Sequence, residues 1–212
     1  MPSRLDARQR AAQLTDACAR LNQSLRLDVR VRGRVPVEPS IIVANHLSYL
    51  DPLAVAEVVP VGAVAKSEIM GWPGVGEAAT ELGILFVKRG CPRSGSVALR
   101  AMMRLLDAGV SVLVFPEGTT STGGDVLPFS RGAFGIAQLK RVPVVPTTIR
   151  YGTPEACWVG DDWLLPHAVK LHRFDRVSVD LVFGPSLQPS TFGDAAELAE
   201  ATRQCVRSLL LP

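Results

Sequence analysis

A short apolar run in this chain ends at a histidine, and an aspartate follows five residues later. The run covers residues 41–44, and its partly β-branched composition predicts a buried strand. Asp51 is followed at once by Pro52, a residue that favours the first turn of a helix, so we expect a helix to start here with Pro52 at its first position. His46 would then lie on a loop at the carboxyl end of a strand. In an α/β sheet, this is the edge where ligands usually bind.

His46 and Asp51 together suggest a base and the carboxylate that orients it. An imidazole can take a proton from a hydroxyl group near neutral pH when a carboxylate fixes its other ring nitrogen. His167 and His172 have no carboxylate at this spacing. The spacing alone is a weak signal, because structural hydrogen bonds could equally satisfy the ring nitrogens of a loop histidine.

The length and composition indicate one globular domain. The chain has 212 residues, of which 47% are hydrophobic and 20% charged, enough for one sizeable core. The net charge is only +3, but residues 1–34 contain eight arginines against three aspartates. Such a basic segment favours attraction to an anionic surface, either a membrane or a nucleic acid. The alternative is a set of solvated arginines on a helix and an edge strand.

The cysteine pattern and the apolar stretches bear on the cellular compartment. The 4 cysteines show neither a CxxC pair nor a ligand spacing, so the sequence suggests no zinc site and no disulfide framework. The first residues are charged where a signal peptide would be apolar, and the longest apolar stretches are much shorter than the ~18 to 20 residues that cross a bilayer. We therefore expect a cytoplasmic protein with reduced thiols and without a spanning helix.

Helical and strand patterns alternate along most of the chain. An apolar stripe at steps of three and four residues predicts an amphipathic helix over residues 1–24, whose apolar side could pack on the core, contact a bilayer or form an oligomer. Residues 25–212 would form the main domain. Strands are expected at 25–31, with a basic exposed face, and at 41–44, 61–65, 83–87, 110–115, 142–149 and 177–183. Helices are expected at 53–58, 75–82, 94–108, 131–141 and 194–211.

This alternation predicts an α/β fold with a mixed, largely parallel sheet flanked by helices. The strand at 142–149 contains Pro143 and Pro146, which lack backbone donors, so we expect it at an edge of the sheet or irregular. Residues 152–173 show neither a helical nor a strand repeat of apolar residues, although tryptophans and leucines make the segment partly apolar.

Three expected strand ends carry the concentrated polar residues. Besides the His46 loop, these are Lys88-Arg89 and Glu117-Gly118-Thr119. A glycine followed by hydroxyl residues can present N–H and hydroxyl groups to an anionic or oxygen-rich ligand. Glu117 could bond a substrate hydroxyl, hold one of the two cations, or cap the next turn. The two cations could also form an ordinary basic turn.

Four stretches in this order resemble the blocks of the glycerolipid acyltransferases, of the lysophosphatidate acyltransferase type. They are residues 45–51, 83–89, 115–121 and 142–146, and the similarity covers roughly residues 25–185. The resemblance implies that His46 is a general base, that Asp51 stabilises its imidazolium, and that an acceptor hydroxyl attacks the thioester of acyl-CoA or acyl carrier protein directly. It implies neither a metal nor a cofactor, and no covalent acyl-enzyme. The chain also has no GxSxG nucleophile motif.

The resemblance also implies substrate contacts, with one departure from the family pattern. Lysophosphatidate enzymes usually carry an arginine, associated with the acceptor phosphate, where this chain has Thr120. Lys88, Arg89 or Arg131 could compensate. The Thr-Thr form looks closer to the bacterial branch that acylates lyso-ornithine lipid and other lysolipids. The implied substrate-binding residues are Asn45, Ser48, Lys88, Arg89, Glu117, Gly118, Thr119 and Thr120.

Many members of this family have a hydrophobic amino-terminal anchor, and none is evident here. We expect the basic helix and the arginine-faced strand to replace it, holding the protein peripherally on the anionic inner face of the membrane rather than on nucleic acid. Three alternatives are a soluble non-lipid acceptor, a hydrolase that uses water, and a non-catalytic protein that binds lipid or acyl carrier.

Overall fold

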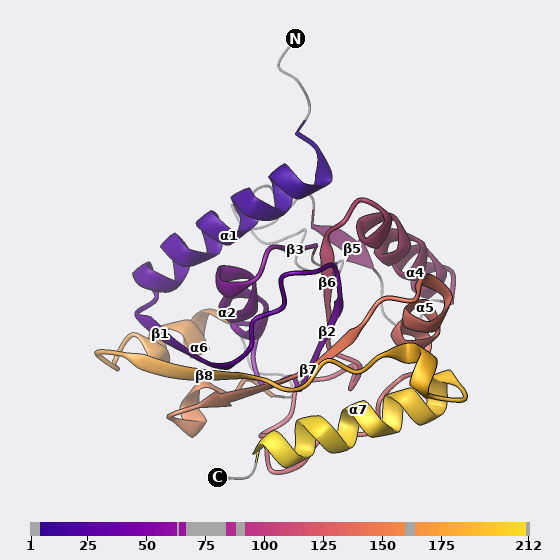
Figure 1. Ribbon diagram of the computed structural model, residues 1–212. Coiled ribbons are helices and arrows are strands. Elements are labelled where there is room, and N and C mark those ends of the chain that lie inside the picture. Colours follow the sequence, from indigo (N-terminus) through magenta and orange to yellow (C-terminus); the bar gives the residue numbers. More distant parts are fainter. Residues whose placement is uncertain (1–4, 63, 67–83, 88–91, 160–163, 211–212) are drawn as a thin grey trace.

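The computed structural model describes residues 5–62, 64–66, 84–87, 92–159 and 164–210. Within them, a six-stranded sheet has the order β1-β8-β7-β2-β6-β3 (Figure 1), and β4 pairs with β5 in a separate parallel pair. In the larger sheet β7 and β8 run antiparallel and the other paired strands run parallel, which confirms the expected mixed, largely parallel sheet. The strands are β1 (Leu27–Gly33), β2 (Ile41–Ala44), β3 (Val61–Gly62), β4 (Val64–Lys66), β5 (Leu85–Val87), β6 (Ser111–Val114), β7 (Val144–Tyr151) and β8 (Val177–Phe183).

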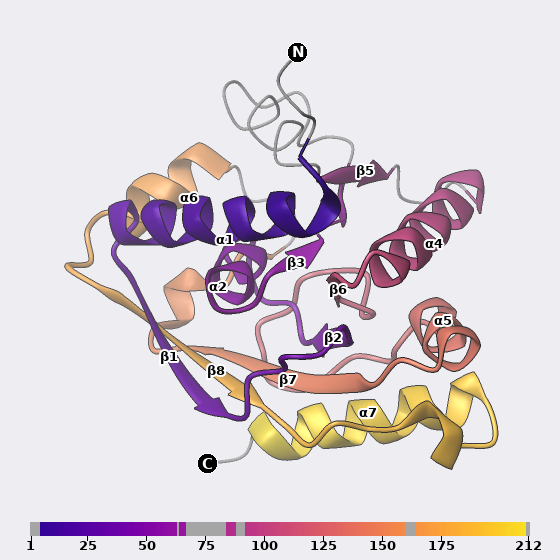
Figure 2. The ribbon, with the colours of Figure 1, turned by 45° about the horizontal axis from the view of Figure 1, so that its top comes forward.

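Helices cover both faces of the large sheet, as Figures 1 and 2 show from two directions. Strand β2 explains why, because its four residues are all buried and alternate between two cores. Ile42 packs with the helices of one face, α1 and α2, and Ile41 with those of the other, α4, α5 and α7. The helices are α1 (Ala7–Ser24), α2 (Asp51–Val58), α4 (Pro92–Asp107), α5 (Gly132–Lys140), α6 (Leu164–Leu171) and α7 (Ala195–Leu210).

Helix α1 uses its apolar side for packing. It begins with a capping box between Asp6 and Gln9, and it packs across α2 (Figure 2). Leu14 and Cys18 are buried in the core below it. The buried stripe continues through Asn22, whereas the neighbouring Leu21 is 44% exposed. Of the three uses considered for this side of the helix, the structure shows core packing.

Asn22 ties α1 to α2 through its side-chain amide. Nδ2 donates to the carbonyl oxygen of Leu53 at 3.0 Å and to Oε2 of Glu57 at 2.7 Å. A polar side chain can occupy this position of the buried stripe because both of its acceptors lie opposite it on α2.

The strand with two prolines was expected at an edge of the sheet or irregular, and the first of these alternatives was wrong. β7 lies inside the sheet, between β8 and β2. Pro143 precedes the strand, and its carbonyl accepts from Ile41 N at 2.9 Å. The carbonyl of Pro146 accepts from Gly184 N at 2.8 Å, so the missing donor of Pro146 also faces the β8 side. The pairing of β7 with β8 starts only at Thr147. Pro146 therefore lies just before the residues that pair with β8, and none of those residues lacks its N–H group.

Other boundaries differ from the sequence pattern. α2 begins at Asp51 with Pro52 in its second position, and α4 begins at Pro92, before residue 94, where the helix was expected to start. α6 lies in the region without a clear period. The helix expected at 75–82 falls outside the described residues.

The last helix begins as expected. Asp194 caps α7, because its Oδ1 accepts from the backbone N–H groups of Ala196 and Glu197, both at 2.8 Å. Among the helices that the structure describes, none has both the length and the apolar character needed to cross a bilayer.

Candidate active site

The loop after β2 brings His46 and Asp51 together. Nδ1 of His46 lies 2.8 Å from Oδ2 of Asp51. Because an ionised carboxylate only accepts hydrogen bonds, this contact assigns the proton to Nδ1 and leaves Nε2 as the basic nitrogen of the neutral ring. The His46 side chain is 12% exposed and that of Asp51 is fully buried. The arrangement suits a base that a buried carboxylate orients and that keeps a small exposed area for a ligand.

Asp51 is surrounded by hydrogen-bond donors. Besides His46, its Oδ2 accepts from the backbone N–H groups of Leu47 at 2.6 Å and Ser48 at 2.9 Å, and its Oδ1 accepts from the hydroxyl of Tyr151 at 2.6 Å. It is also the first residue of α2, where the helix dipole favours a negative charge. A buried carboxylate is tolerated only when it is paired in this way.

Phe115 holds the His46 ring in place. The two rings stack with centroids 4.2 Å apart and planes 18° from parallel. Phe115 directly follows β6, and β6 pairs with β2, so neighbouring strands supply both rings. Stacking restricts rotation of the imidazole and keeps Nδ1 directed at Asp51.

Glu117, in the turn after β6, supports the same loop. Its Oε1 accepts from the backbone N–H of His46 at 2.9 Å, and its Oε2 accepts from that of Leu127 at 3.0 Å. Burial raises the pKa of Glu117, and the hydrogen bonds from Leu127 and His46 oppose that change. Of the three roles considered for Glu117, none anticipated this contact with the histidine backbone. Its expected contact with a substrate hydroxyl stays a prediction.

Asn45 fastens the base of the loop to β7. Its Nδ2 donates to the carbonyl of Ile149 at 3.0 Å, and its Oδ1 accepts from the N–H of the same residue at 2.8 Å. Asn45 and Ser48 are buried, and Ser48 reaches Asp51 through its backbone. The structure therefore gives both residues roles in shaping the loop, and their expected contacts with substrate stay predictions.

The turn after Glu117 lies beside the histidine. The N–H of Ser121 donates to the carbonyl of His46 at 2.9 Å. Gly118 has a φ of 73°, a left-handed conformation that favours glycine. Thr119 is exposed and Thr120 partly so. The turn thus presents two hydroxyl residues next to the dyad. Lys88 and Arg89, expected at the same edge, lie outside the described residues.

The segment around Trp158 closes the other side of the loop. Its backbone N–H donates to the carbonyl of Leu47 at 2.8 Å. The Tyr49 ring meets Trp158 and His167 edge to face, and burial raises the pKa of Tyr49 to about 12. His167 lies within hydrogen-bond distance of the Tyr49 hydroxyl, at 3.3 Å, and of the Cys157 carbonyl, at 3.2 Å.

Sequence reasoning missed Tyr151, Phe115 and this aromatic contact. Phe115 directly precedes the Pro-Glu-Gly motif, so its place at a strand end was a usable signal. Tyr151 lies 100 positions from Asp51 in the chain, and only the pairing of β7 with β2 brings it close.

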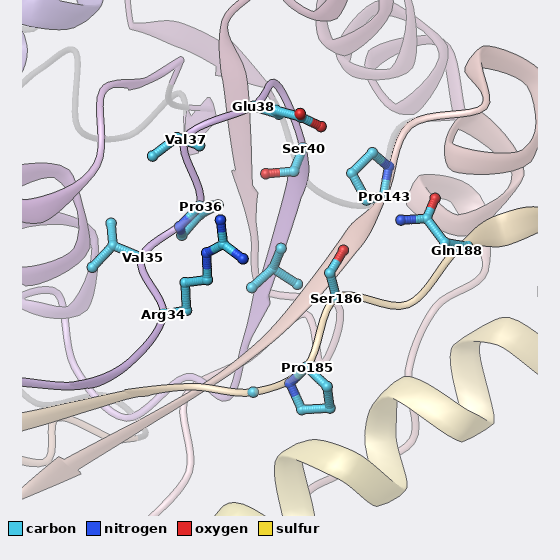
Figure 3. Close-up of a pocket in the computed structure, with 12 residues that line it drawn as sticks. Arg34, Val35, Pro36, Val37, Glu38, Ser40, Pro143, Pro185, Ser186 and Gln188 are labelled. Atoms are coloured by element: carbon cyan, nitrogen blue, oxygen red, sulfur yellow. The ribbon is translucent and has the colours of Figure 1, made fainter.

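A cavity of about 370 Å³ lies at the other end of β2 (Figure 3). Its wall includes Arg34, Ser40, Pro143, Ser186 and Gln188. Ser40 precedes β2, whereas His46 follows it, so the strand separates this cavity from the dyad.

The acyltransferase family model matches residues 26–150 of the chain. A lyso-ornithine lipid O-acyltransferase of Pseudomonas aeruginosa is 36% identical over 197 residues, covering 91% of this chain and 76% of that protein. The protein of the same name from Rhizobium meliloti is 32% identical over 206 residues, covering 88% and 70%.

Two further relatives act on a different acceptor according to their names. The mouse 1-acyl-sn-glycerol-3-phosphate acyltransferase alpha is 41% identical over 126 residues, covering 56% of this chain and 44% of the mouse protein. Among solved structures, the 1-acyl-sn-glycerophosphate acyltransferase PlsC from Thermotoga maritima superposes with a TM-score of 0.72 at 28% identity, covering 94% of this chain and 78% of PlsC.

Proposed function

The chain belongs to the acyltransferase family, and on that premise we propose that it transfers a fatty acyl group from an acyl thioester to the hydroxyl of a lysolipid. The observation that carries this proposal is the 2.8 Å contact between His46 Nδ1 and Asp51 Oδ2 on a strand-end loop. It leaves the other ring nitrogen, Nε2, to take a proton from an acceptor hydroxyl.

In the proposed mechanism, Nε2 of His46 takes the hydroxyl proton as the acceptor oxygen attacks the thioester carbonyl carbon. Asp51 stabilises the imidazolium that forms. The tetrahedral intermediate collapses with cleavage of the carbon–sulfur bond, and the imidazolium returns its proton to the departing thiolate. The products are an ester and a free thiol, and the proposal needs neither a metal, a cofactor nor an acyl-enzyme.

The donor is proposed to be acyl-CoA or acyl carrier protein, and the acceptor a lysolipid of the lyso-ornithine lipid or lysophosphatidate type. The names of the two bacterial relatives favour the first type of acceptor. Thr120 supports the same choice, because a threonine hydroxyl cannot pair with a phosphate as an arginine can. We place the acceptor head group against the turn formed by Gly118, Thr119 and Thr120, and we assign Lys88 and Arg89 to its charged groups.

We further propose that the protein binds the inner membrane face through electrostatic attraction. The apolar side of α1 packs on the core and is not available to a bilayer. The attraction would therefore come from exposed arginines such as Arg30 and Arg32 on the edge strand β1. Salt should weaken such binding.

Sedimentation with anionic liposomes, at low and high salt, tests this proposal, and the variant Arg30→Gln/Arg32→Gln should bind less than the wild type. Arg100→Gln/Arg104→Gln, the same charge change on the exposed face of α4, should bind as the wild type does.

The test of the function is product mass spectrometry with an acceptor panel. The protein is mixed with long-chain acyl-CoA or acyl carrier protein and with lysophosphatidate, lyso-ornithine lipid or another lysolipid. A diacyl product from one acceptor class names the activity. Free fatty acid without an acceptor would indicate a hydrolase instead, and bound but unconsumed thioester with every acceptor would contradict the proposal.

A further inference from the structure

Tyr151 reaches the catalytic dyad from the side opposite His46. Its hydroxyl donates to Oδ1 of Asp51 at 2.6 Å, whereas His46 and two backbone N–H groups donate to Oδ2. The two oxygens of one buried carboxylate thus have different partners. The tyrosine holds one oxygen, and the histidine and the loop hold the other.

The Tyr151 ring is itself firmly placed. It is the last residue of β7, paired with Val179 of β8, and it packs against two of the hydrophobic clusters of the core. Burial, and then the charge of Asp51, raise its pKa well above the ordinary value of a tyrosine. Its hydroxyl therefore keeps its proton and serves Asp51 as a donor throughout the physiological range.

A donor on Oδ1 has two physical consequences. It fixes rotation of the carboxylate about its bond to the side chain, so that Oδ2 stays directed at Nδ1. It also draws negative charge toward the phenol and so weakens the pull of Asp51 on the His46 proton. A base that is held less tightly in its protonated form becomes available at lower pH.

We propose that Tyr151 is a positioning residue that sets the orientation of the Asp51 carboxylate and limits how strongly this carboxylate holds the imidazolium of His46. This inference rests on the general-base role in the proposed function. It adds a third side chain to the dyad, from a strand that neither dyad residue occupies.

The first test compares Tyr151→Phe with Tyr49→Phe. Both remove one phenol hydroxyl near the loop, but only the first removes a donor from Asp51, since the Tyr49 hydroxyl lies against His167. In Tyr151→Phe, kcat/KM should fall about tenfold, the size expected for one hydrogen bond to a charged group. The acidic limb of its pH profile should move to higher pH. In Tyr49→Phe the acidic limb should stay where the wild type has it.

A second readout needs no substrate. The proton on Nδ1 of His46 should give a low-field NMR resonance that reports the strength of its bond to Asp51, and loss of this signal in His46→Ala assigns it. In Tyr151→Phe the resonance should move further downfield, because Asp51 has lost a competing donor. Failure of the acyl-transfer assay would leave this measurement intact, which separates the two proposals.

A graded test avoids any loss of side-chain volume or folding. The chain has 2 tyrosines, so in the Tyr49→Phe background a fluorinated tyrosine supplied during growth replaces Tyr151 alone. Fluorine makes the phenol a stronger donor and should move the resonance and the acidic limb in the direction opposite to Tyr151→Phe. An unchanged resonance and acidic limb in both proteins would overturn the proposal, even if their rates fell.

Discussion

The carboxylate of Glu117 accepts a hydrogen bond from the backbone N–H of His46 at 2.9 Å. The acidic residue after one strand thus braces the histidine after the neighbouring strand. The same carboxylate also accepts from Leu127, so it links the histidine loop to a segment further along the chain. The position of the His46 backbone therefore depends on a residue that lies 71 positions away in the sequence.

Truncation of Glu117 should loosen this loop. We expect Glu117→Ala to lower kcat/KM about tenfold or more, because two backbone donors lose their acceptor and the imidazole shifts. The free energy of unfolding should fall by about 1 kcal/mol, a value reduced for the partial exposure of the group. Kinetics and urea unfolding measure both. Glu38→Ala, which removes an exposed carboxylate near the other end of β2, should leave both close to the wild-type values.

Glu117 should also make the free energy of unfolding depend on pH. Burial raises its folded-state pKa above the ordinary 4.5, so the folded protein binds more protons than the unfolded chain in the interval between these two values. The contribution of Glu117 is therefore most favourable below pH 4.5 and is lost as pH rises through the folded-state pKa. Relative to Glu117→Gln, the wild type should lose unfolding free energy as pH rises through this interval in urea titrations. The opposite slope would refute the assignment.

Asn45 should contribute to the stability of the folded protein through its contact with β7. Asn45→Ala removes both hydrogen bonds to Ile149 and leaves buried backbone groups unpaired, so the free energy of unfolding should fall by about 2 kcal/mol. Urea unfolding checks this value. Thr119→Ala, which truncates an exposed side chain on the adjacent turn, should change stability little. Equal stability of the two variants would show that the contact with β7 is dispensable.

Thr120 should influence the choice of acceptor. We expect Thr120→Arg to raise kcat/KM for lysophosphatidate relative to lyso-ornithine lipid, because a guanidinium can pair with phosphate in two hydrogen bonds. Competition between the two acceptors in one assay gives the ratio directly. Thr122→Arg adds the same charge two positions along the loop, at an exposed residue, and should not reproduce the change. An unaltered ratio in Thr120→Arg would place the acceptor head group elsewhere.

The sequence allowed the sheet and the dyad to be predicted for a common reason. Both depend on local signals, namely alternating apolar runs and a histidine and aspartate separated by one short loop. The edge position expected for the strand with Pro146 was wrong. A residue without an N–H weakens a sheet only where it is paired with a partner residue, and the pairing with β8 begins after Pro146. Helix α6 escaped prediction because its sequence carries no clear period before the chain is folded.

The remaining contacts of the site are long-range. Tyr151 reaches Asp51, and Asn45 reaches Ile149, across about half the length of the chain. No spacing rule connects such residues, since their proximity follows from strand order. The polar strand ends were nevertheless a useful guide, because parallel strands bring their carboxyl ends to one edge of the sheet.

The most direct test of the account is the release of free thiol from acyl-CoA in the presence of the lysolipid acceptor, measured for the wild type, His46→Ala and His172→Ala. His172 is an exposed histidine outside the loop that carries His46, and its variant should work at the wild-type rate. His46→Ala should lose about a thousandfold or more of kcat, as expected when a general base is removed from a triad-like site. Undiminished, lysolipid-dependent thiol release by His46→Ala would contradict the assignment of His46 as the base.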